Sequence, residues 1–305
     1  MSKQMGAVVV AVTNEGLGAW GRREDAILIA LVGLAHSMSH FTQLLLAPMF
    51  PWLRTAFGVS YTELGVVLSA FFIVSCVVQT LSGFVVDRYG ARKILLAGLF
   101  LLGLGTLGYA VSQSYWMLLL SAVIAGVGNG VFHPADYSLF NRKVAPQRLG
   151  HAYSVHGITG SLGWALAPAL VLPLAMAYSW RVAMFSAAVL PWLVLAVAWS
   201  LRTYLNLPAH QARKPVAVNP AGSPSNSESQ DKWAGWRHAT DFMRIPAVWM
   251  CFVFFFFYAT VMSVVQTYAP ESARQLHAVP AHWAAMCLTI YMLCNAIGMV
   301  IGGFL

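Results

Sequence analysis

Residues 94–112 read ILLAGLFLLGLGTLGYAVS, a run of nineteen residues without a charged side chain that follows directly on Arg92 and Lys93. An α-helix needs about 20 mostly apolar residues to cross the hydrocarbon core of a bilayer. The composition of the chain agrees, since 59% of its 305 residues are hydrophobic and 9% are charged. Soluble domains carry about 25% charged residues and could not bury so much apolar surface in one core. The stretch therefore predicts a transmembrane helix in an integral membrane protein.

Seven further stretches of the chain have the same apolar character. Backbone polar groups cannot stay unpaired in lipid, so each stretch should be a helix. The sequence predicts an all-α membrane protein with eight spans, at residues 26–53, 64–86, 94–112, 115–140, 150–178, 182–201, 246–268 and 283–305.

The basic residues predict how these spans are oriented. Of the eighteen Lys and Arg residues, all but Arg54, Arg181 and Arg274 fall on one side if the N-terminus is cytoplasmic. Cytoplasmic loops carry such an excess of basic residues, so we expect an inner (plasma) membrane protein with a cytoplasmic N-terminus and central linker. The formal net charge of +8 does not indicate nucleic-acid binding, because the basic residues are spread over short loops.

The chain divides into four parts. Residues 1–25 are expected to be a cytoplasmic tail, 26–201 a bundle of six helices, 202–244 a disordered linker rich in Pro, Ser, Asn and Gln, and 245–305 the first two helices of a second half. An internal repeat supports two halves, because Gly83-Phe84 near the end of span two recurs as Gly303-Phe304 at the end of span eight. We expect the second half to lack four helices, as a truncated reading frame or a partial product would.

The loop after span two reads GFVVDRYGARK at residues 83–93. Its Gly–acid–base order resembles the signature loop of the major facilitator superfamily. The resemblance implies that family's helical bundle, here a complete N-terminal half and the start of the C-terminal half. It also implies a charged latch that holds the two halves together in the outward-facing state, formed by Gly83, Asp87, Arg88, Gly90, Arg92 and Lys93. The alternative is an ordinary basic cytoplasmic loop that begins where a glycine ends a helix.

Two further motifs lie in spans four and five. Residues 126–136, GVGNGVFHPAD, and His156-Gly157 in the next span resemble the fosmidomycin-resistance branch of the family, although Ala122 stands where many members have an arginine. In span five, three glycines at intervals of three residues and a proline form a ridge of small residues: Gly157, Gly160, Gly163 and Pro168. This ridge predicts either a close helix contact or the motif that family antiporters carry in their fifth helix.

Ionisable side chains inside the spans are the best indicators of a transport pathway, because each is costly in lipid. They are His36, His40, His133, Asp136, His151 and His156, of which His151 lies at the membrane edge. The resemblance implies that helices one and four line a central cavity, so we expect it to be lined by His36, His40, Asn129 and His133, with Asp136 and His156 as further pathway residues. The alternative is that these side chains are hydrogen-bonded between helices as structural links.

We predict a secondary active transporter, a permease or efflux antiporter that moves a small solute by alternating access with proton coupling. A histidine can bind and release a proton near neutral pH, which suits that role. We expect no catalytic residue, metal or cofactor, and a monomer in the bilayer with no nucleic-acid partner. One alternative is a membrane enzyme with a histidine-ligated metal, since His36 and His40 have i, i+4 spacing. Against it, we expect the histidines to be spread over several depths in the membrane. Another alternative is a receptor-like or truncated product that does not transport.

Overall fold

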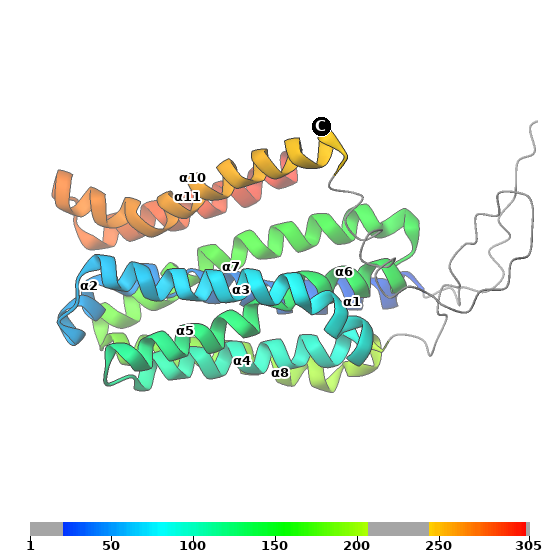
Figure 1. The fold of residues 1–305 in the computed structure, drawn as a ribbon, viewed down its shortest axis with the longest axis horizontal. Helices are drawn as coiled ribbons and strands as arrows, with labels where there is room; N and C mark the ends of the chain where they lie inside the picture. Colours follow the sequence, from blue (N-terminus) through cyan, green and yellow to red (C-terminus); the bar gives the residue numbers. More distant parts are fainter. Residues whose placement is uncertain (1–20, 207–243, 303–305) are drawn as a thin grey trace, which may run out of the picture.

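The computed structural model describes residues 21–206 and 244–302, and its regular structure in these ranges is entirely helical. The long helices run alongside one another (Figure 1). They are α1 (Arg22–Gln43), α2 (Leu46–Phe57), α3 (Tyr61–Tyr89), α4 (Ala91–Val111), α5 (Tyr115–Gly130), α6 (Phe132–Lys143), α7 (Leu149–Ala177), α8 (Trp180–Ser200), α10 (Pro246–His277) and α11 (Ala281–Gly302), with short 3-10 helices at Pro146–Arg148 and Arg202–Leu205.

The prediction of an all-α membrane bundle is confirmed. Seven helical segments of the described chain are long and apolar enough to span a membrane, with α1 and α2 forming one segment and α5 and α6 another. The eighth predicted span corresponds to α11, a helix of 22 residues without an acidic side chain in its first turn or a basic one in its last. Most of the predicted N-terminal tail and most of the predicted linker lie outside the described residues.

Two spans are interrupted where a proline removes a backbone donor. Pro134 cannot donate to the carbonyl four residues earlier, that of Gly130, and α5 ends at this residue. The freed Gly130 carbonyl accepts a hydrogen bond from Ser82 Oγ at 3.2 Å. In the same way Pro48 cannot donate to the carbonyl of Leu44, where α1 gives way to α2. The break after Gly130 sets the position of His133 and Asp136, which follow it in α6.

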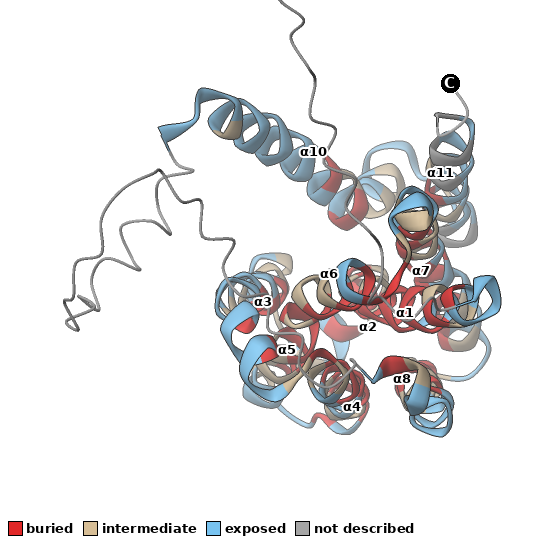
Figure 2. Ribbon diagram, turned by 90° about the vertical axis from the view of Figure 1, so that its right-hand side faces the viewer, coloured by how far each residue is buried: buried red, intermediate tan, exposed pale blue. Residues whose placement is uncertain are grey.

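Small residues allow the helices of the first six spans to pack closely around α1. A Cβ added at Gly105 in α4 would lie 2.7 Å from the Cβ of Ala125 in α5, and one at Gly126 would lie 2.6 Å from the Phe71 carbonyl oxygen in α3. Buried residues gather in the middle of this bundle, while its outer faces are exposed (Figure 2). Exposed apolar faces of this kind are expected where lipid surrounds a helix.

The last two helices contact the bundle in different ways. Helix α11 packs along α7, and Asn295 Nδ2 donates to Ser161 Oγ at 3.3 Å. Helix α10 is exposed over most of its length, with buried side chains only at Met262, Gln266 and Thr267 among those described. Its contact with the bundle lies near its C-terminal end, where Tyr61 Oη at the start of α3 donates to Glu271 Oε1 at 2.6 Å.

Candidate functional site

Three helices bring four histidines and one carboxylate together in the interior of the bundle. His36 and His40 come from α1, His133 and Asp136 from α6, and His156 from α7; we call them the histidine–aspartate cluster. Asp136 has no exposed surface, and His36 and His156 are also buried. Residues four apart share a helix face, which places His36 and His40 on the side of α1 that faces α6 and α7.

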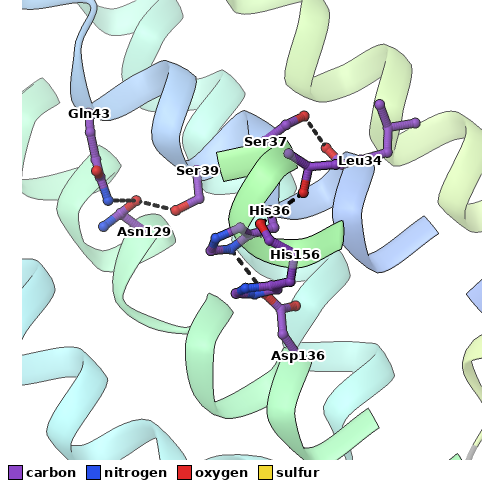
Figure 3. A network of polar contacts seen from close by, with 9 residues as sticks. Leu34, His36, Ser37, Ser39, Gln43, Asn129, Asp136 and His156 are labelled. Atoms are coloured by element: carbon purple, nitrogen blue, oxygen red, sulfur yellow. Dashed lines mark hydrogen bonds and ion pairs between the residues drawn. The ribbon is translucent and has the colours of Figure 1, made fainter. Parts of the chain in front are cut away.

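Asp136 is the centre of the cluster. Its Oδ2 lies 3.0 Å from Nε2 of His156 and 3.2 Å from Nδ1 of His36, so one carboxylate oxygen faces rings from two other helices (Figure 3). The His156 contact is a hydrogen bond, whereas the His36 ring is not aligned for one. The two rings are stacked with their centroids 3.5 Å apart.

The other two histidines, His40 and His133, lie close to His36. The ring centroid of His36 is 4.5 Å from that of His40 and 5.0 Å from that of His133. Both ring nitrogens of His40, Nδ1 of His133 and Oδ1 of Asp136 are buried without a hydrogen-bond partner among the described residues. Buried polar atoms are normally paired, so this cluster has unused capacity to bind a proton, an ion or a polar solute.

Asn129 belongs to a neighbouring network and not to the cluster itself. Its Oδ1 accepts from Ser39 Oγ at 2.6 Å and from Gln43 Nε2 at 3.3 Å, and its Nδ2 donates to Ser75 Oγ at 2.6 Å. The amide therefore joins α1, α3 and α5, and Figure 3 shows its contacts with Ser39 and Gln43 of α1. This is the structural link that the sequence left open as an alternative, and the network reaches the cluster through Trp164, whose indole donates to Gln43 Oε1 at 3.0 Å and whose ring is 4.2 Å from that of His40.

The glycine ridge of span five is a packing surface against α1. A Cβ at Gly163 would overlap the carbonyl group of Ser37, and one at Gly160 would lie 3.2 Å from His36 Nε2 and 3.3 Å from His40 Nδ1. Gly157 lies half-buried in the same helix, and Pro168 is buried within it. The ridge thus brings α7 close to α1 at the level of the histidine–aspartate cluster.

The loop that resembles the family latch is exposed at the end of α3. Gly90 has φ +90°, a backbone conformation that favours glycine, and Asp87 forms an ion pair with Arg142 of α6 at 2.6 Å. Arg92 contacts Asn206, Arg88 lies over the Tyr89 ring, and Lys93 is exposed. A close helix approach at Gly83 is not seen, because no described atom lies within 4 Å of an added Cβ there and this face of α3 is exposed.

Sequence reasoning missed two partners at this end of the bundle. Arg142, which pairs with Asp87, lies 55 positions away in the chain. Asp25 was assigned to the tail, yet it is buried in the first turn of α1 and accepts from Arg148 Nε at 2.7 Å. The position of this acidic residue directly before a predicted span could have indicated that it has a basic partner. His151, expected at the membrane edge, is exposed near the start of α7.

One argument from the sequence is wrong. The histidines were expected at several depths, which counted against a shared metal site, but the structure brings His36, His40 and His133 together, with one potential ligand atom of each within 4.8 Å of the others. One potential ligand atom from each of His36, Asp136 and His156 also lies within 4.8 Å of the other two. The sequence does not give the depth of His133 relative to histidines of other spans, because the fourth span is interrupted between α5 and α6 just before His133.

Fold and site together define a polytopic α-helical membrane protein with ionisable groups buried between its helices. The sequence matches the family model of the Major Facilitator Superfamily over residues 30–305, and the chain belongs to this family of membrane transporters. The match confirms the resemblance noted in residues 83–93.

Individual relatives agree with this assignment. The chain is 29% identical to the MFS-type transporter YfnC of Bacillus subtilis over 46% of its own length and 34% of that protein. It is 27% identical to the fosmidomycin resistance protein of Escherichia coli over 47% of its length and 35% of that protein. The chain thus covers about a third of the length of these relatives.

A solved structure shows the same fold. A bacterial homologue of the human drug peptide transporters PepT1 and PepT2 superposes with a TM-score of 0.52 at 18% identity, over 61% of this chain and 43% of that one.

Proposed function

We propose that this chain acts in a secondary active transporter that moves a small solute by alternating access and couples the movement to protons. The observation that carries the proposal is the histidine–aspartate cluster, in which Asp136 Oδ2 lies 3.0 Å from His156 Nε2 and 3.2 Å from His36 Nδ1. Histidine and aspartate side chains can bind and release protons, and the cluster joins three helices.

The cluster can link protonation to conformation. An uncompensated charge costs several kcal/mol in a low-dielectric interior, about 3–5 where one partner of a buried pair is missing. Adding or removing a proton at Asp136 or its histidines therefore changes the free energy of bringing α1, α6 and α7 together around a bound solute. A ligand that interacts differently with two conformations shifts the population between them, which is the requirement for coupled transport.

The helix arrangement supports alternating access as the mode of transport. The start of α3 and the C-terminal end of α10 meet through the Tyr61–Glu271 hydrogen bond of 2.6 Å, while the N-terminal part of α10 is exposed. On the predicted orientation, the two halves meet on the outer side, as in an inward-facing state. The charged loop around Asp87 and Gly90 would then be the latch that forms when the inner side closes.

We place the protein in the inner (plasma) membrane as a monomer, with its N-terminus and the 202–244 linker in the cytoplasm. The charge distribution supports this orientation, because only Arg54, Arg181 and Arg274 would face the outside. The solute is a small molecule, in keeping with the family.

The proposal is tested in everted membrane vesicles that hold a proton gradient reported by acridine orange. Solutes from a panel that begins with fosmidomycin, the compound in the name of one relative, are added to vesicles with and without the protein. We expect at least one to release protons in a protein-dependent way, and Asp136→Asn to abolish the release. His151→Gln is the matched control, because His151 is exposed and away from the cluster. Proton release that is equal in wild type and Asp136→Asn would contradict the role of the cluster.

A further inference from the structure

We propose that His36, His40 and His133 form a binding site for a divalent transition-metal ion of the zinc, cobalt or nickel class. This inference rests on the transport function proposed above. The metal ion would be the solute that the transporter carries. Imidazole nitrogen is a preferred ligand of these ions, and three histidines with one open position is a common zinc arrangement.

The three histidines lie close enough together to share one ion. One nitrogen from each of the three rings lies within 4.8 Å of the others. The rings are not parallel: the interplanar angles are 58° for His36–His40, 60° for His36–His133 and 83° for His40–His133. Three nitrogens around a tetrahedral zinc ion lie about 3.3 Å apart. Small side-chain rotations would therefore bring the three lone pairs onto one ion.

Nitrogen atoms of two of these histidines have hydrogen-bonding capacity that no described residue uses. Nδ1 and Nε2 of His40 and Nδ1 of His133 are buried and have no hydrogen-bond partner within the described ranges. A neutral imidazole always has one nitrogen that can only accept, so at least one lone pair on each ring is available to a cation.

Asp136 supplies the orientation that metal-binding histidines usually need. Its carboxylate lies 3.2 Å from Nδ1 of His36 without a hydrogen bond, so a small rotation of the His36 ring would be needed to place a proton between them and leave the Nε2 lone pair for a metal. Gly160 lies beside this Nε2 and beside Nδ1 of His40, at 3.2 and 3.3 Å from the place of an added Cβ. Both nitrogens therefore face one side, where the glycine leaves room.

The charge of the surroundings favours a cation over an anion. No Lys or Arg occurs within three residues of His36, His40, His133 or His156 in the sequence, and the one carboxylate of the cluster is negative when ionised. A divalent ion with neutral histidine ligands would be offset in part by this carboxylate.

The first experiment measures metal binding directly. The protein is purified in detergent with a tag that contains no histidine, treated with EDTA, and titrated with Zn²⁺ by calorimetry and with Co²⁺ by visible absorption. We expect one ion per chain and the intense visible bands of tetrahedral Co²⁺. We expect His40→Gln and His133→Gln to weaken binding by more than about 100-fold and Asp136→Asn by about 10–100-fold.

His151→Gln removes an exposed histidine of α7 and should bind as wild type does. Loss of binding in His151→Gln with retention in His40→Gln, or no binding by wild type, would overturn the proposal. If a cluster variant fails to fold, X-ray absorption at the zinc edge of wild-type protein counts its imidazole ligands, and fewer than three also overturns it.

The two proposals can fail separately. Vesicles loaded with a zinc-sensitive dye test whether the bound ion crosses the membrane. Binding without protein-dependent flux would show that the ion is not the transported solute. The proton-release experiment with organic solutes would then be the remaining test of the proposed transporter. Absence of metal binding together with proton release by an organic solute would leave the proposed transporter standing and remove the metal site.

Discussion

At the scale of single residues, Gly163 is where the contact between α1 and α7 tolerates least change. A Cβ there would overlap the Ser37 carbonyl group. We expect Gly163→Ala to lower the unfolding free energy by about 1–3 kcal/mol, the usual cost of overpacking. Gly150→Ala in the same helix is the control, because nothing lies within 4 Å of its added Cβ. Thermal unfolding followed by tryptophan fluorescence measures both, and equal unfolding temperatures would contradict the packing argument.

Two arginines at the same end of the bundle allow a second prediction. Arg142 pairs with Asp87 on the surface, where both side chains are more than half exposed, whereas Arg148 pairs with Asp25, which is 1% exposed. Surface pairs contribute about 0–1 kcal/mol, but removing one partner of a buried pair costs about 3–5 kcal/mol. We expect Arg148→Gln to lower the unfolding temperature far more than Arg142→Gln. Asp25→Asn in the Arg148→Gln background should recover part of the loss, and no recovery would argue against an uncompensated charge.

The sequence identified every member of the histidine–aspartate cluster, because ionisable residues in apolar spans are rare and costly. It did not predict that His156 and His36 would share one oxygen of Asp136. That contact depends on the rotation and depth of three helices, which hydropathy does not report. For the same reason we expected Asn129 to line a cavity, whereas its amide is hydrogen-bonded to Ser39 and Gln43 of α1 and to Ser75 of α3.

At the scale of helices, the turn between α3 and α4 depends on Gly90. Its φ of +90° is strained for any residue with a Cβ. We expect Gly90→Ala to lower the unfolding free energy by about 1–2 kcal/mol. Gly83→Ala, in the helix before the turn with open space around it, should be neutral or slightly stabilising. The two variants are compared by thermal unfolding, and a loss at Gly83 equal to that at Gly90 would point to packing and not to backbone strain.

The sequence predicts which stretches of the chain are helical, but it does not predict where a helix is interrupted. Apolar runs of about 20 residues mark the spans, since lipid leaves the backbone no alternative to a helix. The breaks after α1 and α5 follow from Pro48 and Pro134, each of which lacks the donor for the carbonyl four residues earlier. Many membrane helices continue through a proline, so the sequence does not say which prolines interrupt a span.

At the scale of the whole molecule, the orientation in the membrane is open to test. Ser227 lies in the predicted linker, outside the described residues, and Thr55 is exposed near the end of α2. In a background where the four native cysteines are replaced by alanine, we expect an impermeant thiol reagent added to intact cells to label Thr55→Cys and not Ser227→Cys. Permeabilised cells should label both, and the reverse pattern in intact cells would invert the topology.

In the proposed alternating-access mechanism, the contact between α3 and α10 would determine on which side the molecule opens. Tyr61 Oη donates to Glu271 Oε1 at 2.6 Å, and Arg274 pairs with the same carboxylate at 2.9 Å. A hydrogen bond to a charged group contributes about 1.5–3 kcal/mol, enough to change the ratio of two conformations by about tenfold or more. Tyr61→Phe removes this bond with little change of shape and should favour separation of the two halves at this end.

Accessibility measures that shift. Ala47 is 7% exposed and lines a cavity of about 40 Å³ between α2, α7, α10 and α11, next to Glu271. With the native cysteines replaced, we expect Ala47→Cys to react with an impermeant thiol reagent about tenfold faster when Tyr61→Phe is present, because its labelling requires the separated state. Tyr89→Phe, at the opposite end of α3 and 55% exposed, should leave the rate unchanged. A rate that does not respond to Tyr61→Phe would mean that the Tyr61–Glu271 bond does not hold the outer side closed. The balance would then depend on the packing of α11 along α7, the other contact between the two halves.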